Sequence, residues 1–306
     1  MINLKFDDSF FEEEKRCDYL ITQKAKKVWA VELDLLNELI RVCKKYDIKV
    51  TLFAGTLLGA IRHKGIIPWD DDIDVCLTRE EYDKLCKVAP IEFRQPYFFQ
   101  NNESDPQYLF GYSRLRNSLT TGYIVGYDSP NYNNGIYIDV FVMDGYVDKD
   151  SLLKKQLRKK RELELLAELY KRNVFSQKPF KRIVKKMLIS VFSPIISMFI
   201  SYEKIVKKYE DNLQIYNNEA ANVSLITHNL FFIRKYWCNK KDLMDVTYVP
   251  FENLMVPVPS RYDAMLTHMY GNYMEFPPAE KRGAWHEGIL ELDPDIPYQD
   301  YLKKKR

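Results

Sequence analysis

Cysteine and histidine are scarce in this sequence, and their scarcity limits the disulfide and zinc chemistry open to the chain. There are five cysteines and four histidines, and no two cysteines form a C-x-x-C pair. An odd number of cysteines without paired spacing fits neither a disulfide framework nor a zinc cluster. We therefore expect reduced thiols, as in a cytoplasmic protein.

The sequence also lacks a segment long enough to cross a membrane. The apolar stretch from Met187 to Ile200 has fourteen residues and contains Pro194, whereas a spanning helix needs roughly 18–20. Residues 1–14 lack the charged segment followed by an apolar one that marks a secretion signal. We predict a cytoplasmic protein that can lie at the inner face of the membrane.

Net charge is low as well. At +3 it indicates no anionic partner, and we expect no nucleic-acid binding. The charge is unevenly spread, because thirteen Lys or Arg residues stand against three Glu between Lys154 and Lys186. Residues 180–208, apolar in the middle and basic at both ends, have the pattern of a helix that makes peripheral contact with an anionic membrane. A buried core helix flanked by solvated lysines has the same pattern, so both interpretations stay open.

The spacing of apolar residues predicts an α+β protein in three parts. Helical spacing covers residues 19–46, 56–63, 79–88, 151–172 and 180–209. Short apolar runs predict strands at 48–53, 73–77, 97–100, 112–115 and 136–142. We expect a mixed-sheet core with flanking helices in 1–149, a basic, mostly helical insertion in 150–245, and a C-terminal segment, 246–306, that returns to the core.

Four carboxylates fall within five positions, at Asp70, Asp71, Asp72 and Asp74. Such neighbours repel one another unless cations or positive side chains neutralise them. Alternate residues of a strand face the same side, so we expect Asp70, Asp72 and Asp74 to converge on one point. Mg²⁺ binds through one or two carboxylates together with substrate phosphates. The pattern therefore predicts a catalytic metal site.

Two simpler interpretations of the acidic segment fit less well. A solvated acidic turn would not alternate with apolar residues such as Ile73 and Val75. A calcium loop that begins at Asp70 would have Glu81 at its twelfth position. Val75, however, stands where that loop needs a glycine, and a β-branched residue does not easily adopt the required turn.

The stretch from Gly55 to Asp74, G-T-L-L-G-A-I-R-H-K-G-I-I-P-W-D-D-D-I-D, resembles the LicD phosphocholine transferases and the related fukutin and fukutin-related proteins. That family in turn resembles the polymerase-beta-like nucleotidyltransferases. The segments Tyr137–Gly145 and Tyr270–His286 resemble two further motifs of the family, so the resemblance runs from about Leu20 to His286. It implies a nucleotidyltransferase-like sheet.

The resemblance also implies roles for individual residues. Asp72 and Asp74 would bridge two Mg²⁺ or Mn²⁺ ions, and Asp139 would be the third ligand and the general base. Asp70 would be a further ligand or would orient the others. Donor phosphates would be bound by Gly55 and Thr56, with contributions from a set of basic and imidazole side chains: Arg62, His63, Arg114, Arg116, Arg282 and His286.

The implied reaction moves phosphocholine, or a similar phospho-alcohol, from a CDP-linked donor such as CDP-choline to a sugar hydroxyl. The acceptor would be a cell-surface glycan or a lipid-linked precursor, as in teichoic acid or lipopolysaccharide biosynthesis. Choline would need a cage of aromatic rings, and Trp69, Tyr273 and Trp285 lie beside the motifs without defining one. Two alternatives stay open: a nucleotidylyltransferase that moves a nucleoside monophosphate, and a catalytically inactive, membrane-associated scaffold.

Overall fold

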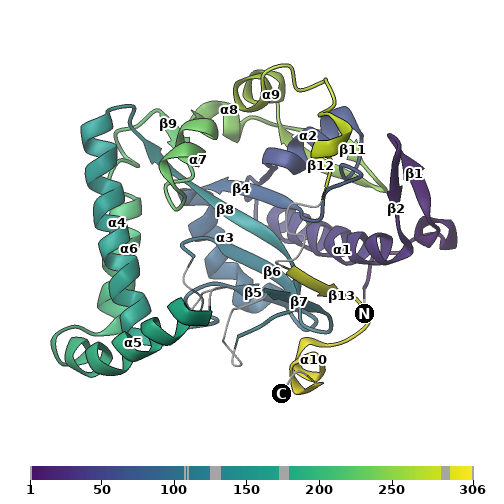
Figure 1. The fold of residues 1–306 in the computed structure, drawn as a ribbon. Helices are drawn as coiled ribbons and strands as arrows, with labels where there is room; N and C mark the ends of the chain where they lie inside the picture. The colour runs from purple at the N-terminus through teal and green to yellow at the C-terminus, as the bar shows by residue number, and fades with distance from the viewer. Residues whose placement is uncertain are drawn as a thin grey trace.

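A seven-stranded mixed sheet forms the centre of the protein in the computed structural model (Figure 1), which describes residues 2–106, 108, 110–124, 132–171, 179–283 and 290–304. Its longest strand is β8, in which every residue is buried. β8 pairs in parallel with β4 and antiparallel with β6 and β9. The seven strands are β3 (Thr51–Leu52), β4 (Asp74–Thr78), β5 (Tyr97–Gln100), β6 (Ser113–Asn117), β8 (Ile136–Tyr146), β9 (Asn222–Ser224) and β10 (Cys238–Asn239).

Helices α1 (Gln23–Lys45) and α3 (Arg79–Glu92) pack on one face of this sheet. The helix predicted for residues 19–46 thus forms, and Thr22 caps its first turn by accepting a hydrogen bond from the amide of Ala25 at 3.2 Å. The other face carries Cys76, Phe141 and Met143, which pack against a smaller apolar cluster. The elements above that face are α7 (Leu230–Lys235), α8 (Lys240–Met244) and α9 (Tyr262–Tyr270).

Three helices form an arm beside the sheet, at the left of Figure 1. They are α4 (Asp150–Lys171), α5 (Pro179–Phe199) and α6 (Tyr202–Leu213). The single helix predicted for residues 180–209 is wrong, because the chain leaves the helical path after Phe199 and Ser201 caps a new helix by accepting from the amide of Lys204. No single helix in the described ranges is long and apolar enough to cross a membrane; Met187–Phe199 and Tyr202–Leu213 meet that test only together, with an 84° bend.

The sequence patterns did not predict several short strands. Two hairpins, β1–β2 and β11–β12, and the pair β7–β13 each form a two-stranded sheet separate from the central one. The hairpin β11–β12 contains Pro250, Pro257 and Pro259, which strand patterns normally exclude and which edge strands tolerate. These strands are β1 (Glu14–Arg16), β2 (Tyr19–Ile21), β7 (Thr121–Ile124), β11 (Val246–Phe251), β12 (Leu254–Pro259) and β13 (Leu290–Asp293).

The remaining elements are α2 (Ala54–Arg62), α10 (Tyr298–Lys304) and two 3₁₀ turns, Asp8–Phe11 and Ala279–Lys281. The α+β class, with a mixed sheet, flanking helices and a helical insertion, is confirmed. Segment 150–245 contributes β9 and β10 to the central sheet as well as its helices. The three-part division at residues 149 and 245 stays a prediction.

Candidate active site

The sheet brings Asp74 and Asp139 side by side. Strands β4 and β8 run in parallel, and their register pairs Asp74 with Asp139. The amide of Asp139 donates to the carbonyl of Ile73 at 3.0 Å, which holds this end of the two strands together. Paired residues of neighbouring strands point to the same face. The two carboxylates therefore share one face and one edge of the sheet.

Asp70, Asp71 and Asp72 lie in the loop before β4, so the expected strand alternation of Asp70, Asp72 and Asp74 is wrong. The loop nevertheless gathers its carboxylates, since one oxygen from each of the three lies within 4.8 Å of the other two. Burial, reinforced by the charges of Asp72 and Asp71, raises the pKa of Asp70 well above its usual range. Proximity of like charges explains the direction of that shift.

The charges of the loop aspartates also act on the carboxylates of the two strands. Burial raises the pKa of Asp74, and the charges of Asp72 and Asp139 raise it further. Five carboxylates thus share one region, an all-oxygen donor set that suits Mg²⁺ or Mn²⁺. Within the described residues, the mutually close group is Asp70, Asp71 and Asp72. The ligand trio of Asp72, Asp74 and Asp139 stays a prediction.

The turn from β3 into α2 lies against this acidic region. The hydroxyl of Thr56 accepts a hydrogen bond from the amide of Asp74 at 2.8 Å. Gly55 allows close approach, because a Cβ there would stand 3.0 Å from Oδ2 of Asp70. Ala54, just before, has a φ of 45°, which strains a residue with a side chain. Amides in the first turn of a helix have no partner within the helix, so this turn can present donors to an anion.

Arg114 forms an ion pair with one of the carboxylates. Its Nε donates to Oδ1 of Asp139 at 2.7 Å, and the two side chains are 6% and 9% exposed. Nη1 of Arg114 is buried and has no hydrogen-bond partner among the described residues. A buried donor without a partner costs stability, and a bound phosphate oxygen would satisfy it. The predicted phosphate-binding role of Arg114 is thus compatible with its geometry.

Arg116 has different surroundings, although it lies only two residues further along β6. It is fully buried, and its guanidinium donates to the side chain of Gln100 and to the carbonyl of Gly135. The ring of Tyr137 lies 4.5 Å from it. These contacts link β6 to β5 and to the turn before β8. Nη2 of Arg116, like Nη1 of Arg114, is buried without a hydrogen-bond partner among the described residues, and the phosphate contact predicted for Arg116 stays a prediction.

Arg62 fastens α2 to the C-terminal segment. Its Nη1 donates to the carbonyls of Tyr273 and Glu275 at 2.8 and 2.9 Å. Arg282 likewise connects separate segments, because it donates hydrogen bonds to the backbone carbonyls of Pro277 and Cys17. Both guanidinium groups therefore already have backbone acceptors, and their predicted contact with phosphate would have to use the nitrogens that remain.

His63 stacks on Phe276 at 5.3 Å and meets Trp69 edge-on at 5.8 Å. Burial, with the neighbouring Arg62, lowers the pKa of His63 to about 4, so its ring is neutral at neutral pH. Nε2 of the ring is buried and lacks a partner among the described residues. The predicted contacts of His286 and Trp285 lie outside the described residues.

Glu32 is a candidate that the sequence analysis missed. It is 1% exposed, and its Oε2 has no hydrogen-bond partner among the described residues. Burial, followed by the charges of the three loop aspartates, raises its pKa well above the usual range. One turn earlier on α1, the indole of Trp29 donates to the carbonyl of Asp70 at 3.4 Å, so this face of the helix meets the acidic loop.

A signal for Glu32 was present in the sequence. The residue stands four positions after Val28 and four before Leu36, which places it on the apolar face of the predicted helix. A carboxylate on such a face is buried with the apolar residues around it. Acidic residues are rarely buried without a partner, so its position marked it as unusual.

The parallel pair β4–β8, the turn into α2 and the gathered carboxylates define a nucleotidyltransferase-like protein. Comparison with known proteins agrees: the family model described as "LicD/FKTN/FKRP, nucleotidyltransferase domain" matches residues 47–178. The chain is also 27% identical over 254 residues to the lipopolysaccharide cholinephosphotransferase LicD of Haemophilus influenzae. That alignment covers 83% of this chain and 92% of the relative.

Shorter similarities exist to uncharacterised proteins of Rickettsia prowazekii and Rickettsia typhi. They are 41% and 39% identical over 61 residues, which is 20% of this chain and 23% and 19% of the relatives. Residues 47–178 thus form a LicD-type domain, and most of the chain is similar to one member of that family. The protein is accordingly an enzyme of the transferase class.

Proposed function

We propose that the protein transfers phosphocholine, or a similar phospho-alcohol, from a CDP-linked donor to a sugar hydroxyl of a glycan or lipid-linked precursor of the lipopolysaccharide type. The main support is the similarity, over 83% of the chain, to an enzyme named as a lipopolysaccharide cholinephosphotransferase. The observation in the structure that carries the proposal is the pairing of Asp74 with Asp139 beside the loop aspartates. This group can bind the cations that a pyrophosphate donor brings with it.

Two Mg²⁺ or Mn²⁺ ions are proposed as cofactors, held by Asp72, Asp74 and Asp139 with help from Asp70. When bound, such ions neutralise phosphate charge and lower the pKa of an attacking hydroxyl. The residues of the chain would then orient the donor. Amides of the first turn of α2 and the free Nη1 of Arg114 would donate to phosphate oxygens.

In the proposed reaction the sugar oxygen attacks the phosphorus that carries choline, in line with the leaving CMP. The new P–O bond forms as the bond to CMP breaks, and the hydroxyl proton passes to Asp139. Oδ1 of Asp139 is held by Arg114 at 2.7 Å, so Oδ2 is the oxygen that can face a cation or the attacking hydroxyl. The ion pair thus fixes the orientation of the general base.

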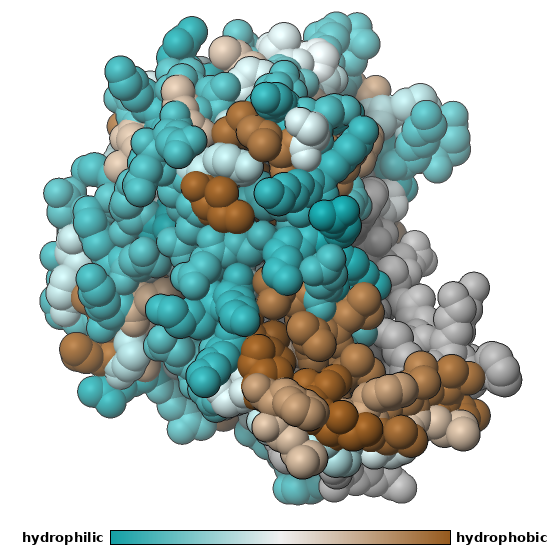
Figure 2. Space-filling model, turned by 90° about the vertical axis from the view of Figure 1, so that its left-hand side faces the viewer, coloured by the Kyte–Doolittle hydropathy of each residue, from teal (hydrophilic) through white to brown (hydrophobic). Residues whose placement is uncertain are grey.

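We further propose that the enzyme works at the inner face of a membrane and contacts it through α5. This helix exposes a continuous apolar surface, seen as the brown patch in the lower part of Figure 2. Phe199 and Met198 are 83% and 80% exposed, and Met187 is 66% exposed. Exposed apolar patches of this kind mark contact surfaces. The patch comprises Ile183, Val184, Met187, Leu188, Val191, Phe192, Ile195, Met198 and Phe199.

Positive charge next to the patch supports a membrane of anionic lipid. Lys204, Lys207 and Lys208 are exposed on α6, directly after the patch. The sequence places four more basic residues on α5 just before it, at positions 181, 182, 185 and 186. Lysines beside an inserted apolar helix bind anionic head groups. A glycan acceptor with a lipid anchor would then reach the enzyme in the plane of the membrane.

The reaction is tested by incubating the purified protein with CDP-choline, Mg²⁺ and candidate glycans. The proposal expects release of CMP that depends on both the metal and the acceptor, and phosphocholine on the glycan by mass spectrometry. Release of pyrophosphate from a nucleoside triphosphate, without transfer from CDP-choline, would identify a nucleotidylyltransferase instead. Absence of both products with every acceptor tested would leave the scaffold alternative.

A further inference from the structure

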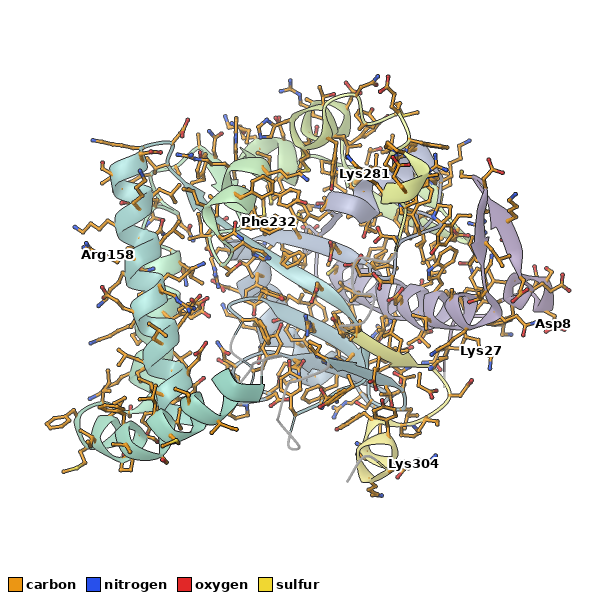
Figure 3. All side chains as sticks on the ribbon, viewed as in Figure 1. Asp8, Lys27, Arg158, Phe232, Lys281 and Lys304 are labelled. Carbon is orange, nitrogen blue, oxygen red and sulfur yellow. The ribbon has the colours of Figure 1, made fainter. Side chains whose placement is uncertain are left out.

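Six aromatic side chains form a ring of contacts above the face of the sheet that carries Asp74 and Asp139, and Phe141 also contacts His228 across this ring at 5.3 Å. The six side chains come from separate parts of the chain: the residue before α2, the residue before β6, strand β8, the loop after β9, and α7 with the residue that follows it. Phe232 of α7 is labelled in Figure 3. The centroid distances around the ring are Phe53–Phe141 6.1 Å, Phe141–Tyr112 4.8 Å, Tyr112–His228 5.9 Å, His228–Phe232 5.9 Å, Phe232–Tyr236 5.7 Å and Tyr236–Phe53 5.4 Å.

The ring adjoins the carboxylates on the same side of the sheet. Phe141 follows Asp139 by two residues on β8, so both side chains point to one face. The amide of Phe53 donates to the carbonyl of Asp74 at 2.9 Å. Burial raises the pKa of Tyr236, and the charge of Asp74 raises it further, so this ring is close to the acidic group. A ligand with its phosphates at the carboxylates can therefore extend to the aromatic ring.

The ring is not fully buried. Tyr112, His228, Phe232 and Tyr236 are only partly buried, whereas Phe53 and Phe141 form its buried base. Burial, with the nearby Lys160, lowers the pKa of His228 to about 4, so its imidazole is uncharged at neutral pH and does not repel a cation. Ring faces attract cations, and the neighbouring carboxylates add negative potential.

The polar atoms of the ring favour a quaternary ammonium over a primary one. A primary ammonium has three N–H donors that need acceptors, and a trimethylammonium has none. Two of the polar groups at this place are engaged: Nδ1 of His228 pairs with the hydroxyl of Thr227 at 2.9 Å, and the side chain of Tyr236 is hydrogen-bonded to Tyr270. The phenyl groups of Phe53, Phe141 and Phe232 offer only their faces.

We propose that this aromatic ring binds the trimethylammonium group of the transferred phosphocholine and so selects choline over ethanolamine. The inference rests on the proposed function, since it names the part of the donor that the ring recognises. Lys235 lies 5.1 Å from the aromatic ring of Tyr236, and the guanidinium of Arg114 lies 5.9 Å from that of Tyr112, so these side chains already attract cations. The ligand occupies the side that faces Asp74.

The test compares affinities for three probes, CDP-choline, CDP-ethanolamine and CMP, by calorimetry with Mg²⁺ present. Phe232→Leu keeps an apolar side chain but removes a ring face. We expect it to weaken CDP-choline binding about tenfold, the value of a partly desolvated cation–π contact, and to leave the other two affinities within about twofold. Tyr236→Leu, a second variant, should have the same selective effect. Phe199→Leu is the matched control, because Phe199 is 83% exposed and lies on α5, away from the ring.

Equal loss of affinity for all three probes would mean that the rings stack on the cytosine or only support the fold, and would overturn the proposal. If Phe232→Leu and Tyr236→Leu both keep the wild-type preference for CDP-choline over CDP-ethanolamine, the proposal is also overturned. These outcomes are separate from failure of the proposed function, in which the wild-type protein transfers nothing from CDP-choline to any glycan. Circular dichroism of each variant checks that the fold is kept.

Discussion

Arg114 and Asp139 form an ion pair across strands β6 and β8, with Nε of the arginine donating to Oδ1 of the aspartate at 2.7 Å. Both side chains are buried. Arg114 therefore places a fixed positive charge beside the five carboxylates. The buried pair also connects Asp139, the proposed general base, to a guanidinium that can donate to a phosphate. Removal of one partner leaves the other charge buried without compensation.

We expect Arg114→Gln to lower the free energy of unfolding by about 3–5 kcal/mol in the metal-free protein, because Asp139 and Asp74 lose their buried counter-charge. Divalent cations should restore part of the loss, since they supply positive charge at the same carboxylates. Urea titration with EDTA and with Mg²⁺ measures both effects. Arg41→Gln is the control, because Arg41 is half exposed in its pair with Glu38 and should cost less than about 1 kcal/mol. Equal effects of the two substitutions would contradict the prediction.

Asp72→Asn should abolish transfer while the protein stays folded. The substitution removes one charge from the group that would hold the cations, and metal-dependent phosphoryl transfer depends on that charge. We expect CMP release to fall by several orders of magnitude and the melting temperature in EDTA to stay constant or rise, because the loop aspartates repel one another. A variant whose rate is within tenfold of wild type would exclude a metal role for this residue.

Glu32→Gln should stabilise the metal-free protein, and increasingly so at higher pH. The folded pKa of Glu32 is raised above the unfolded value of about 4.5, so the folded state binds more protons and wild-type stability falls as pH rises through that interval. Each unit between the two pKa values corresponds to about 1.4 kcal/mol. Melting curves in EDTA between pH 5 and 9 should show a growing gap between variant and wild type. A gap that is the same at every pH would show that Glu32 does not titrate in this range.

The sequence predicted the strands that carry the site more accurately than it predicted how those strands bring the site residues together. Val75, Ile138 and Val140 are apolar and β-branched, so the strands around Asp74 and Asp139 were visible in the pattern. Their parallel pairing was not visible, because register depends on contacts between distant segments. The ring of six aromatic side chains could not be predicted from the sequence for the same reason, since its members are spread from residue 53 to residue 236.

Two further features were predicted wrongly because they depend on single residues at the ends of helices and strands. The helix break after Phe199 depends on Ser201, a single capping residue inside an apolar and basic run whose helical spacing continues on both sides. The loop position of Asp70 and Asp72 was missed because strand alternation was extended backwards past Ile73. In the fold, β4 starts at Asp74, and the carboxylates meet through the path of the loop.

The proposed membrane contact of α5 leads to a prediction about Met198 and Phe199, the most exposed large apolar side chains among the described residues. Met198→Glu combined with Phe199→Glu should abolish co-flotation with vesicles that contain about one third anionic lipid. Burial of a large apolar side chain contributes about 1.5–3 kcal/mol, so loss of two, with added negative charge, should lower the partition coefficient more than a hundredfold. Ile91→Glu, at a 62% exposed position on α3, is the control and should still float. Because α5 lies apart from the carboxylates, CMP release with a water-soluble acceptor should stay unchanged in the double variant. Wild-type protein that fails to float with anionic vesicles, or a double variant that floats equally well, would exclude α5 as the contact.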